Sequence, residues 1–205
     1  MVIPRPVLAA LFILAPPAGA MADANPAASA FIREFGAESL KELTDRATPP
    51  AEREARFRRL LVEHFDMAAI SKFALGRYWR SATDSQRSAF KKAHEDFIVH
   101  SYAARFVDYQ GVGFQVVGSV NEAAGVIVVH SRTRTSKTEE VFLDWHLRAA
   151  GDSFVIVDLV VEGVSMAVTQ RSDFGSIIQN GGSIDGLIEA LRAKNSEPAG
   201  SQPKL

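Results

Sequence analysis

The sequence predicts an α+β domain in which helices at both ends flank a four-stranded antiparallel sheet. Apolar residues recur at helical spacing up to about residue 109, alternate with a period of two over residues 114–161, and return to helical spacing afterwards. The 205 residues suffice for one domain, and the contents of 47% hydrophobic and 23% charged residues are ordinary globular values. A formal net charge of −1 argues against a nucleic-acid binder, which usually carries a basic face.

The first 22 residues have the layout of a secretory signal peptide. Arg5 gives a positive start, Val7–Ala15 is a nine-residue apolar core, and two A-x-A sites follow it. We expect cleavage after Ala22 and export; an uncleaved membrane anchor is the alternative.

One domain is expected over residues 23–195, followed by a flexible tail over residues 196–205 that is rich in Ser, Pro and Gly. The chain has no cysteine, which excludes a disulfide framework, thiolate metal sites and a lipoprotein anchor.

Helices are expected at both ends of the domain. The apolar spacing predicts them over residues 27–46, around Phe57–Phe65, from Asp66 to Leu75, over 84–109, over 165–179 and over 184–194. The 84–109 helix begins at a capping box in which Thr83 is followed by Gln86. Its large apolar residues cover an arc of roughly 180°, wider than the ~100° stripe of an ordinary surface helix. That arc fits a helix packed on two neighbours, or one that also lines an apolar cavity.

Four strands are expected between these helical regions, over residues 114–120, 125–134, 139–148 and 153–161. The third strand places Val141, Leu143, Trp145 and Leu147 on one face. Because apolar residues also occur on opposite faces of the fourth strand, the sheet is either covered on both sides or sharply curved.

No complete catalytic constellation emerges. The segment Gly163–Ala167 resembles a nucleophile elbow around Ser165, but that class needs a later histidine and the last one is His146. Ser165 therefore fits a helix cap. Asp144 and His146 share a strand face, with His130 on the adjacent strand, and could form an acid–base pair or a metal site in a cup-shaped pocket. An enzyme that uses these residues is the alternative interpretation. Our prediction is that the protein has no enzymatic activity and binds no metal and no cofactor.

Two stretches of the sequence carry a family resemblance. Residues 75–87 (LGRYWRSATDSQR) with Phe90, and residues 161–165 (VEGVS), 170–174 (QRSDF) and 181–188 (GGSIDGLI), resemble the signatures of MlaC-type periplasmic phospholipid-binding proteins, also called toluene-tolerance auxiliary proteins. The resemblance covers about residues 30–195. It departs at Phe154, where the family commonly has Trp, and at Gln170, where it commonly has Tyr. Residues 165–171 resemble a branch associated with hopanoid biosynthesis.

The resemblance implies a carrier in the periplasm of a Gram-negative bacterium. It would exchange a phospholipid, or alternatively a hopanoid-associated lipid, between an outer-membrane lipoprotein–porin assembly and an inner-membrane ABC transporter with an MCE-domain subunit. The implied fold is α+β and related to nuclear-transport-factor-like and cystatin-like folds, with a curved sheet and helices enclosing an apolar cavity for acyl chains.

Eight residues are candidates for the lipid cavity. They come from the long helix, the sheet and the segment beyond it: Phe97, Tyr102, Phe106, Val128, Leu143, Trp145, Val164 and Phe174.

Overall fold

The computed structural model describes residues 23–109, 113–134 and 140–196 and confirms the α+β fold. Its helices are α1 (Pro26–Leu43), α2 (Pro50–His64), α3 (Met67–Leu75), η1 (Gly76–Trp79), α4 (Asp84–Tyr102), η2 (Ala103–Tyr109), η3 (Ala123–Gly125), α5 (Met166–Gly181) and α6 (Ile184–Asn195). Its strands are β1 (Phe114–Asn121), β2 (Ile127–Arg134), β3 (Glu140–Ala150), β4 (Ser153–Val161) and β5 (Val164–Ser165). The segment 1–22, predicted to be a signal peptide, the tail from 197 and the expected turn at 136–137 lie outside the described residues. Within the described ranges, no helix is both long and apolar enough to cross a membrane.

The sheet has five antiparallel strands in the order β1-β2-β3-β4-β5, one more than the sequence predicted. The extra strand is β5, whose two residues pair with the end of β4 across a tight turn at Glu162 and Gly163. Both turn residues have positive φ angles, 50° and 78°. Irregularities between Val116 and Gly118 and between His146 and Leu147 interrupt the ladder, and such bulges bend a sheet.

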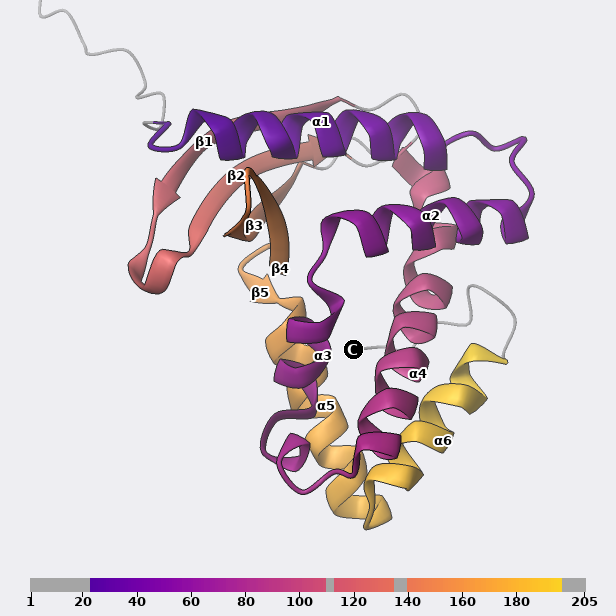
Figure 1. The fold of residues 1–205 in the computed structure, drawn as a ribbon. Helices are drawn as coiled ribbons and strands as arrows, with labels where there is room; N and C mark the ends of the chain where they lie inside the picture. The colour runs from indigo at the N-terminus through magenta and orange to yellow at the C-terminus, as the bar shows by residue number, and fades with distance from the viewer. Residues whose placement is uncertain (1–22, 110–112, 135–139, 197–205) are drawn as a thin grey trace, which may run out of the picture.

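Helix α1 lies across one face of the sheet, and its N-terminus is anchored to β1 (Figure 1). Ser119 on β1 accepts a hydrogen bond from the Asn25 backbone N–H (2.7 Å) and donates one to Asp23 (2.6 Å). The hydrogen bonds from Ser119 and then Ser29 hold the pKa of Asp23 below its usual value. Helix α1 ends at Leu43, three residues earlier than predicted; the Thr44 hydroxyl donates to the carbonyl of Leu40 at this end.

The other helices extend from the sheet as two pairs (Figure 1). Helix α3 packs on α5 and α4 packs on α6, and the pairs meet at the end away from the sheet. The long helix predicted to reach residue 109 is α-helical only to Tyr102 and continues as the tighter 3₁₀ helix η2. Short 3₁₀ stretches are frequent at helix ends. This change of pitch carries the chain from the helical half back toward the sheet.

Candidate functional site

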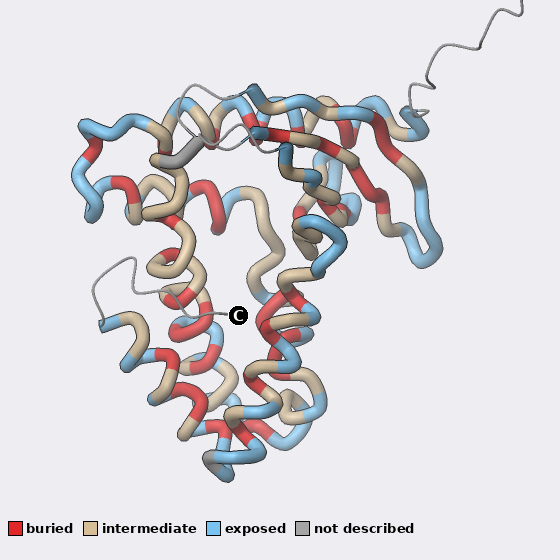
Figure 2. The backbone as a smooth tube through the Cα atoms, turned by 180° about the vertical axis from the view of Figure 1, so that it is seen from behind, coloured by how far each residue is buried: buried red, intermediate tan, exposed pale blue. Residues whose placement is uncertain are grey.

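The described part of the chain contains two separate groups of buried apolar side chains. The first, which we call the helical cluster, comprises Ala74, Leu75, Ala82, Phe90, Ala93, Phe97, Phe174, Ile178, Ile184, Leu187, Ile188 and Leu191. The second, the sheet cluster, comprises Ala28, Ile32, Phe35, Leu43, Leu60, Ile127, Val129, Trp145, Leu147 and Ile156. Figure 2 shows buried positions both in the sheet and in the helices below it. The clusters share no member, so the domain has two cores.

Partly buried apolar side chains border each cluster, and we call five of them, together with Tyr102, the seam. Ile98 borders the helical cluster, and Phe57, Phe106, Leu143 and Leu159 border the sheet cluster. The Phe57 and Phe106 rings are in contact, with centroids 5.4 Å apart, so α2 meets η2 here. Large apolar groups left half-buried mark an interior that is not closed as tightly as either core.

Tyr102 crosses the seam from α4 to α5. Its hydroxyl lies 3.9 Å from the Met166 sulfur, a weak contact between the end of one helix and the start of the other. Burial raises the pKa of Tyr102, and the nearby Arg105 guanidinium opposes this shift. The phenol therefore stays neutral at physiological pH. Ile98 lies one helical turn before Tyr102 and on the same face of α4, so the apolar stripe runs from the helical cluster into the seam.

Six of the eight residues that the sequence singled out lie in one of the two clusters or at the seam, three of them as buried core residues. Phe97 and Phe174 pack together in the helical cluster, with ring centroids 6.2 Å apart. Tyr102 and Phe106 lie at the seam, as does Leu143.

Trp145 is buried in the sheet cluster, where its indole N–H donates to the Ser131 hydroxyl (2.8 Å). Its ring makes edge contacts with Phe35 and Phe114. This hydrogen bond fixes the largest side chain of the sheet cluster.

The other two candidates lie elsewhere. Val128 pairs with His146, so it points to the sheet face opposite the one that carries Trp145, because side chains alternate along a strand. Val164 is 52% exposed on the edge strand β5. Neither side chain therefore lies with the other six.

Sequence reasoning missed a buried polar network between α3, α4 and α5. His94 is fully buried; its Nδ1 lies 3.1 Å from the Ser71 hydroxyl and its Nε2 lies 2.9 Å from the Gln170 carboxamide oxygen. The imidazole stacks on Phe90 and meets the edge of Phe174. Burial lowers the pKa of His94 to about 4, although the Gln170 hydrogen bond acts in the opposite direction. The available signal was its position between Phe90 and Phe97, on the apolar stripe of α4.

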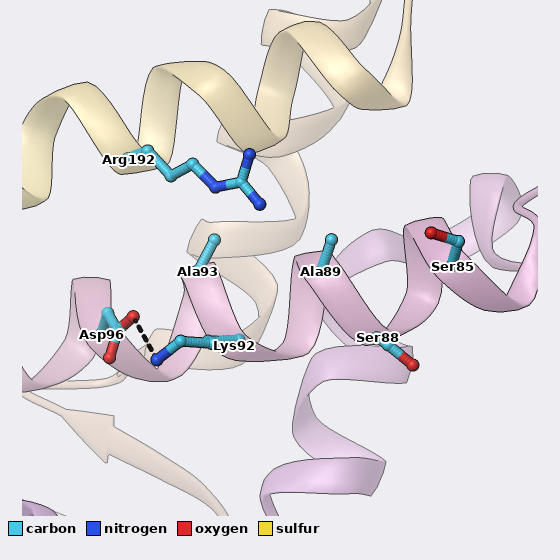
Figure 3. A pocket seen from close by; sticks show the side chains of 7 residues that line it. All are labelled: Ser85, Ser88, Ala89, Lys92, Ala93, Asp96 and Arg192. Carbon is cyan, nitrogen blue, oxygen red and sulfur yellow. Dashed lines mark hydrogen bonds and ion pairs between the residues drawn. The ribbon is translucent and has the colours of Figure 1, made fainter.

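The described pockets near the helical cluster are of two kinds. A cavity of about 40 Å³ lies between α4, α5 and α6 and is lined in part by Phe97, Phe174 and Ile177. This is far below the roughly 300–1,000 Å³ of usual small-molecule sites. A more open groove of about 410 Å³ runs between α4 and α6 (Figure 3). Its lining combines Ala89 and Ala93 with polar side chains, among them Lys92, which is paired to Asp96 at 3.2 Å.

The three residues of the alternative acid–base site, Asp144, His146 and His130, share one face of the sheet. His130 Nδ1 lies 2.7 Å from an Asp144 carboxylate oxygen, on the sheet face away from the sheet cluster. Asp158, opposite His146 on the next strand, accepts from the Ser165 hydroxyl and the Ala167 backbone N–H.

Ser165 also caps α5, as predicted, by accepting from the backbone of Val168. The hydroxyl and the Asp158 carboxylate thus hold a helix start. Among the described residues, no group of three or more His, Asp or Glu side chains is arranged to hold a metal ion.

Comparison with known proteins places this geometry in a family. The family model described as MlaC protein matches residues 36–193, which is most of the chain. The chain belongs to the MlaC family. A solved structure of a phospholipid-binding protein from Ralstonia solanacearum, in complex with a phospholipid, is similar to it with a TM-score of 0.75 at 20% sequence identity. The match covers 82% of this chain and 97% of that chain. At this identity the likeness shows a shared fold.

Proposed function

We propose that this protein is a periplasmic lipid carrier that binds acyl chains at the seam between its two clusters. Family membership and the half-buried apolar seam support this proposal together. The lipid is a phospholipid, or a hopanoid-associated lipid as residues 165–171 suggest. Carriage runs between an outer-membrane lipoprotein–porin assembly and an inner-membrane ABC transporter with an MCE-domain subunit, after removal of residues 1–22. No side chain need take part in a covalent step.

The physical requirement on a carrier is to replace the bilayer around the lipid chains. Two acyl chains hold about 30 methylenes, and exposing them to water costs on the order of 24 kcal/mol at ~0.8 kcal/mol each. The 40 Å³ cavity beside Phe97 is far too small for them. Binding at the seam would move the helical and sheet clusters apart. Separation at the seam would expose half-buried apolar groups to the chains while leaving the fully buried side chains of each core in place.

The direct test is to identify what the protein carries. The protein is purified from the periplasm without refolding and extracted with organic solvent, and the released lipid is identified by mass spectrometry. We expect one stoichiometric phospholipid; a hopanoid would select the alternative. Protein that carries no lipid and takes none up from vesicles of either composition would contradict the proposal.

A charge placed at the seam tests the location. In Leu143→Glu, a carboxylate would lie among the acyl chains, and an unpaired charge there excludes lipid or draws in water. We expect a folded protein that has lost its lipid in native mass spectrometry. Val62→Glu is the matched control, because Val62 is 56% exposed on α2 and the same charge there should leave both fold and lipid load intact. A folded Leu143→Glu protein with a full lipid load would place the lipid elsewhere.

A further inference from the structure

An exposed surface on α3, η1 and α5 combines cations with apolar side chains. We call it the α3–α5 face and define it by Lys72, Phe73, Arg77, Arg80, Val168 and Arg171, all of which are exposed. Phe73 is 41% exposed and Val168 is 56% exposed, so two large apolar side chains reach solvent on this face. Helices α3 and α5 lie side by side, and the chain runs directly from α3 into η1, which contains Arg77 and is followed by Arg80 (Figure 1).

Arg171 joins the two helices of this face. Its guanidinium carbon lies 5.0 Å from the centroid of the Phe73 ring, a cation–π contact from α5 to α3. Its side chain also passes over Gly76, where an added Cβ would lie 3.0 Å from the Arg171 Nε. Val168 precedes Arg171 by three residues and shares its side of α5. The face thus presents an aromatic ring, an aliphatic group and a guanidinium together.

The cations of this face have no carboxylate partner in the described structure. Among the described residues, Lys72, Arg77, Arg80 and Arg171 take part in no ion pair, and α3 and η1 contain no acidic residue. Asp173, the acidic residue of α5, faces the small cavity beside Phe174 instead.

The arginines of α2 show the contrast. Arg56 pairs with Glu52, Arg58 with Glu95 and Asp96, and Arg59 with Glu38, Glu42 and Glu63. The α3–α5 face is therefore positive within a chain whose formal net charge is −1.

We propose that the α3–α5 face docks the protein on an anionic membrane surface. Unpaired Lys and Arg side chains attract anionic headgroups, and exposed apolar and aromatic groups beside them enter the headgroup region. Several cations beside exposed apolar groups suit an array of anionic headgroups.

Docking on this face has a geometric link to the seam. Val168 is two residues beyond Met166, whose sulfur contacts Tyr102 across the seam. Docking would therefore hold one edge of the seam near the membrane. This use in lipid loading rests on the proposed function, whereas the docking itself does not.

Vesicle binding of charge variants provides the test. Binding to vesicles of phosphatidylcholine with 30% phosphatidylglycerol is compared with binding to phosphatidylcholine alone, by flotation at low and high salt. The triple variant Lys72→Gln, Arg77→Gln, Arg80→Gln removes three cations of the face. Lys41→Gln, Arg46→Gln, Lys91→Gln is the matched control, since it removes three exposed cations from α1, the α1–α2 connection and α4. Both variants have the same net charge and the same termini.

We expect the wild type to bind the anionic vesicles in a salt-dependent way. Each Lys or Arg near an anionic surface contributes about fivefold in affinity, so the face variant should bind about a hundredfold more weakly and the control should change far less. Phe73→Ser should weaken binding further, whereas Val62→Ser on α2 should not. Equal loss in both triple variants, equal binding to neutral vesicles, or no vesicle binding by the wild type would each overturn the proposal.

Lipid content separates this proposal from the proposed function. Bound lipid is measured by native mass spectrometry on the same samples. A face variant that keeps its lipid but loses vesicle binding supports docking by this surface. If the wild-type protein carries lipid but does not bind vesicles, membrane docking is refuted and the proposed carrier function stands. If the protein binds vesicles but carries no lipid, only the carrier function is refuted. Binding of the face to a purified acidic periplasmic protein, with none to anionic vesicles, would assign the surface to a protein partner instead.

Discussion

Replacing His94 with glutamine should remove a pH-dependent part of the protein's stability. The imidazole is fully buried between Phe90 and Phe174 and has neutral hydrogen-bonding partners in Ser71 and Gln170. Burial lowers its pKa to about 4 from 6.5. The charged form is thus disfavoured in the folded protein but not in the unfolded chain.

The sign and size of the effect follow from proton linkage. Above pH 6.5 the imidazole is neutral in both states and adds no pH dependence. Between pH 6.5 and about 4 the unfolded chain binds a proton that the folded protein does not, so the free energy of unfolding falls as the pH falls. A shift from 6.5 to about 4 corresponds to about 3 kcal/mol, at ~1.4 kcal/mol per pKa unit. Below pH 4 both states are protonated and the loss ends.

The measurement compares urea unfolding of the wild type and His94→Gln between pH 7.5 and 4, followed by circular dichroism. At pH 7.5 we expect the variant to be less stable by about 1–3 kcal/mol, because the ring contacts are lost. Relative to the wild type, the variant should gain about 3 kcal/mol on going to pH 4, so that it is there as stable as the wild type or more stable. Gln170→Leu is the control: it keeps the imidazole and must keep the acid-dependent loss. A stability difference between wild type and His94→Gln that does not vary with pH would refute the reasoning.

Three further substitutions test the packing, each by thermal and urea unfolding. Gly36→Ala should cost about 1–3 kcal/mol, because its Cβ would lie 2.4 Å from a phenylalanine ring of β1, whereas Gly175→Ala has no atom within 4 Å and should be neutral or stabilising. Arg53→Met should cost about 2–4 kcal/mol, since the buried guanidinium donates to three backbone carbonyls around the α1–α2 connection. Ser131→Ala should cost about 1–3 kcal/mol, because the Trp145 indole N–H loses its acceptor.

Features set by neighbouring residues were predictable from the sequence. Thr83 and Ser165 were expected to cap helices, and both side chains accept a backbone hydrogen bond at a helix start. A cap needs only the residues that follow it within one turn, so the local sequence contains the whole interaction. The period of two likewise located the four long strands.

Features set by distant parts of the chain were not predictable. The strand β5 exists because Val164 and Ser165 fold back on β4, and two residues carry no periodicity. The change from α-helix to 3₁₀ helix after Tyr102 accompanies the contacts of η2 with α2 near Phe57. A strand pattern also gives two faces without saying which is covered, and this is why Val128 lies apart from Trp145.

The candidate site was only partly predictable, because it too depends on contacts between distant parts of the chain. The wide apolar arc over residues 84–109 allowed either two neighbours or a cavity wall, and the structure divides it between both clusters. Phe90 and Phe97 enter the helical cluster, while Tyr102 and Phe106 lie at the seam. Periodicity cannot distinguish a core position from a seam position, because the difference depends on which residues of α5 and the sheet pack against each side chain. The role of His94 was hidden likewise, since its partners are 23 and 76 residues away.

Two cores in one chain allow the protein to open locally at one core without opening at the other. Each core contains fully buried residues whose amide protons exchange slowly, namely Leu147 and Ile156 in the sheet cluster and Leu187 and Leu191 in the helical cluster. The two cores can open at different free-energy cost. Hydrogen exchange would then report two cooperative blocks, with the slowest protons of each block exchanging together. A protein whose two cores can separate while each stays folded can admit a long, flexible lipid chain without unfolding. Separation of the two cores, the movement proposed for lipid entry, would then already occur among the fluctuations of the lipid-free protein.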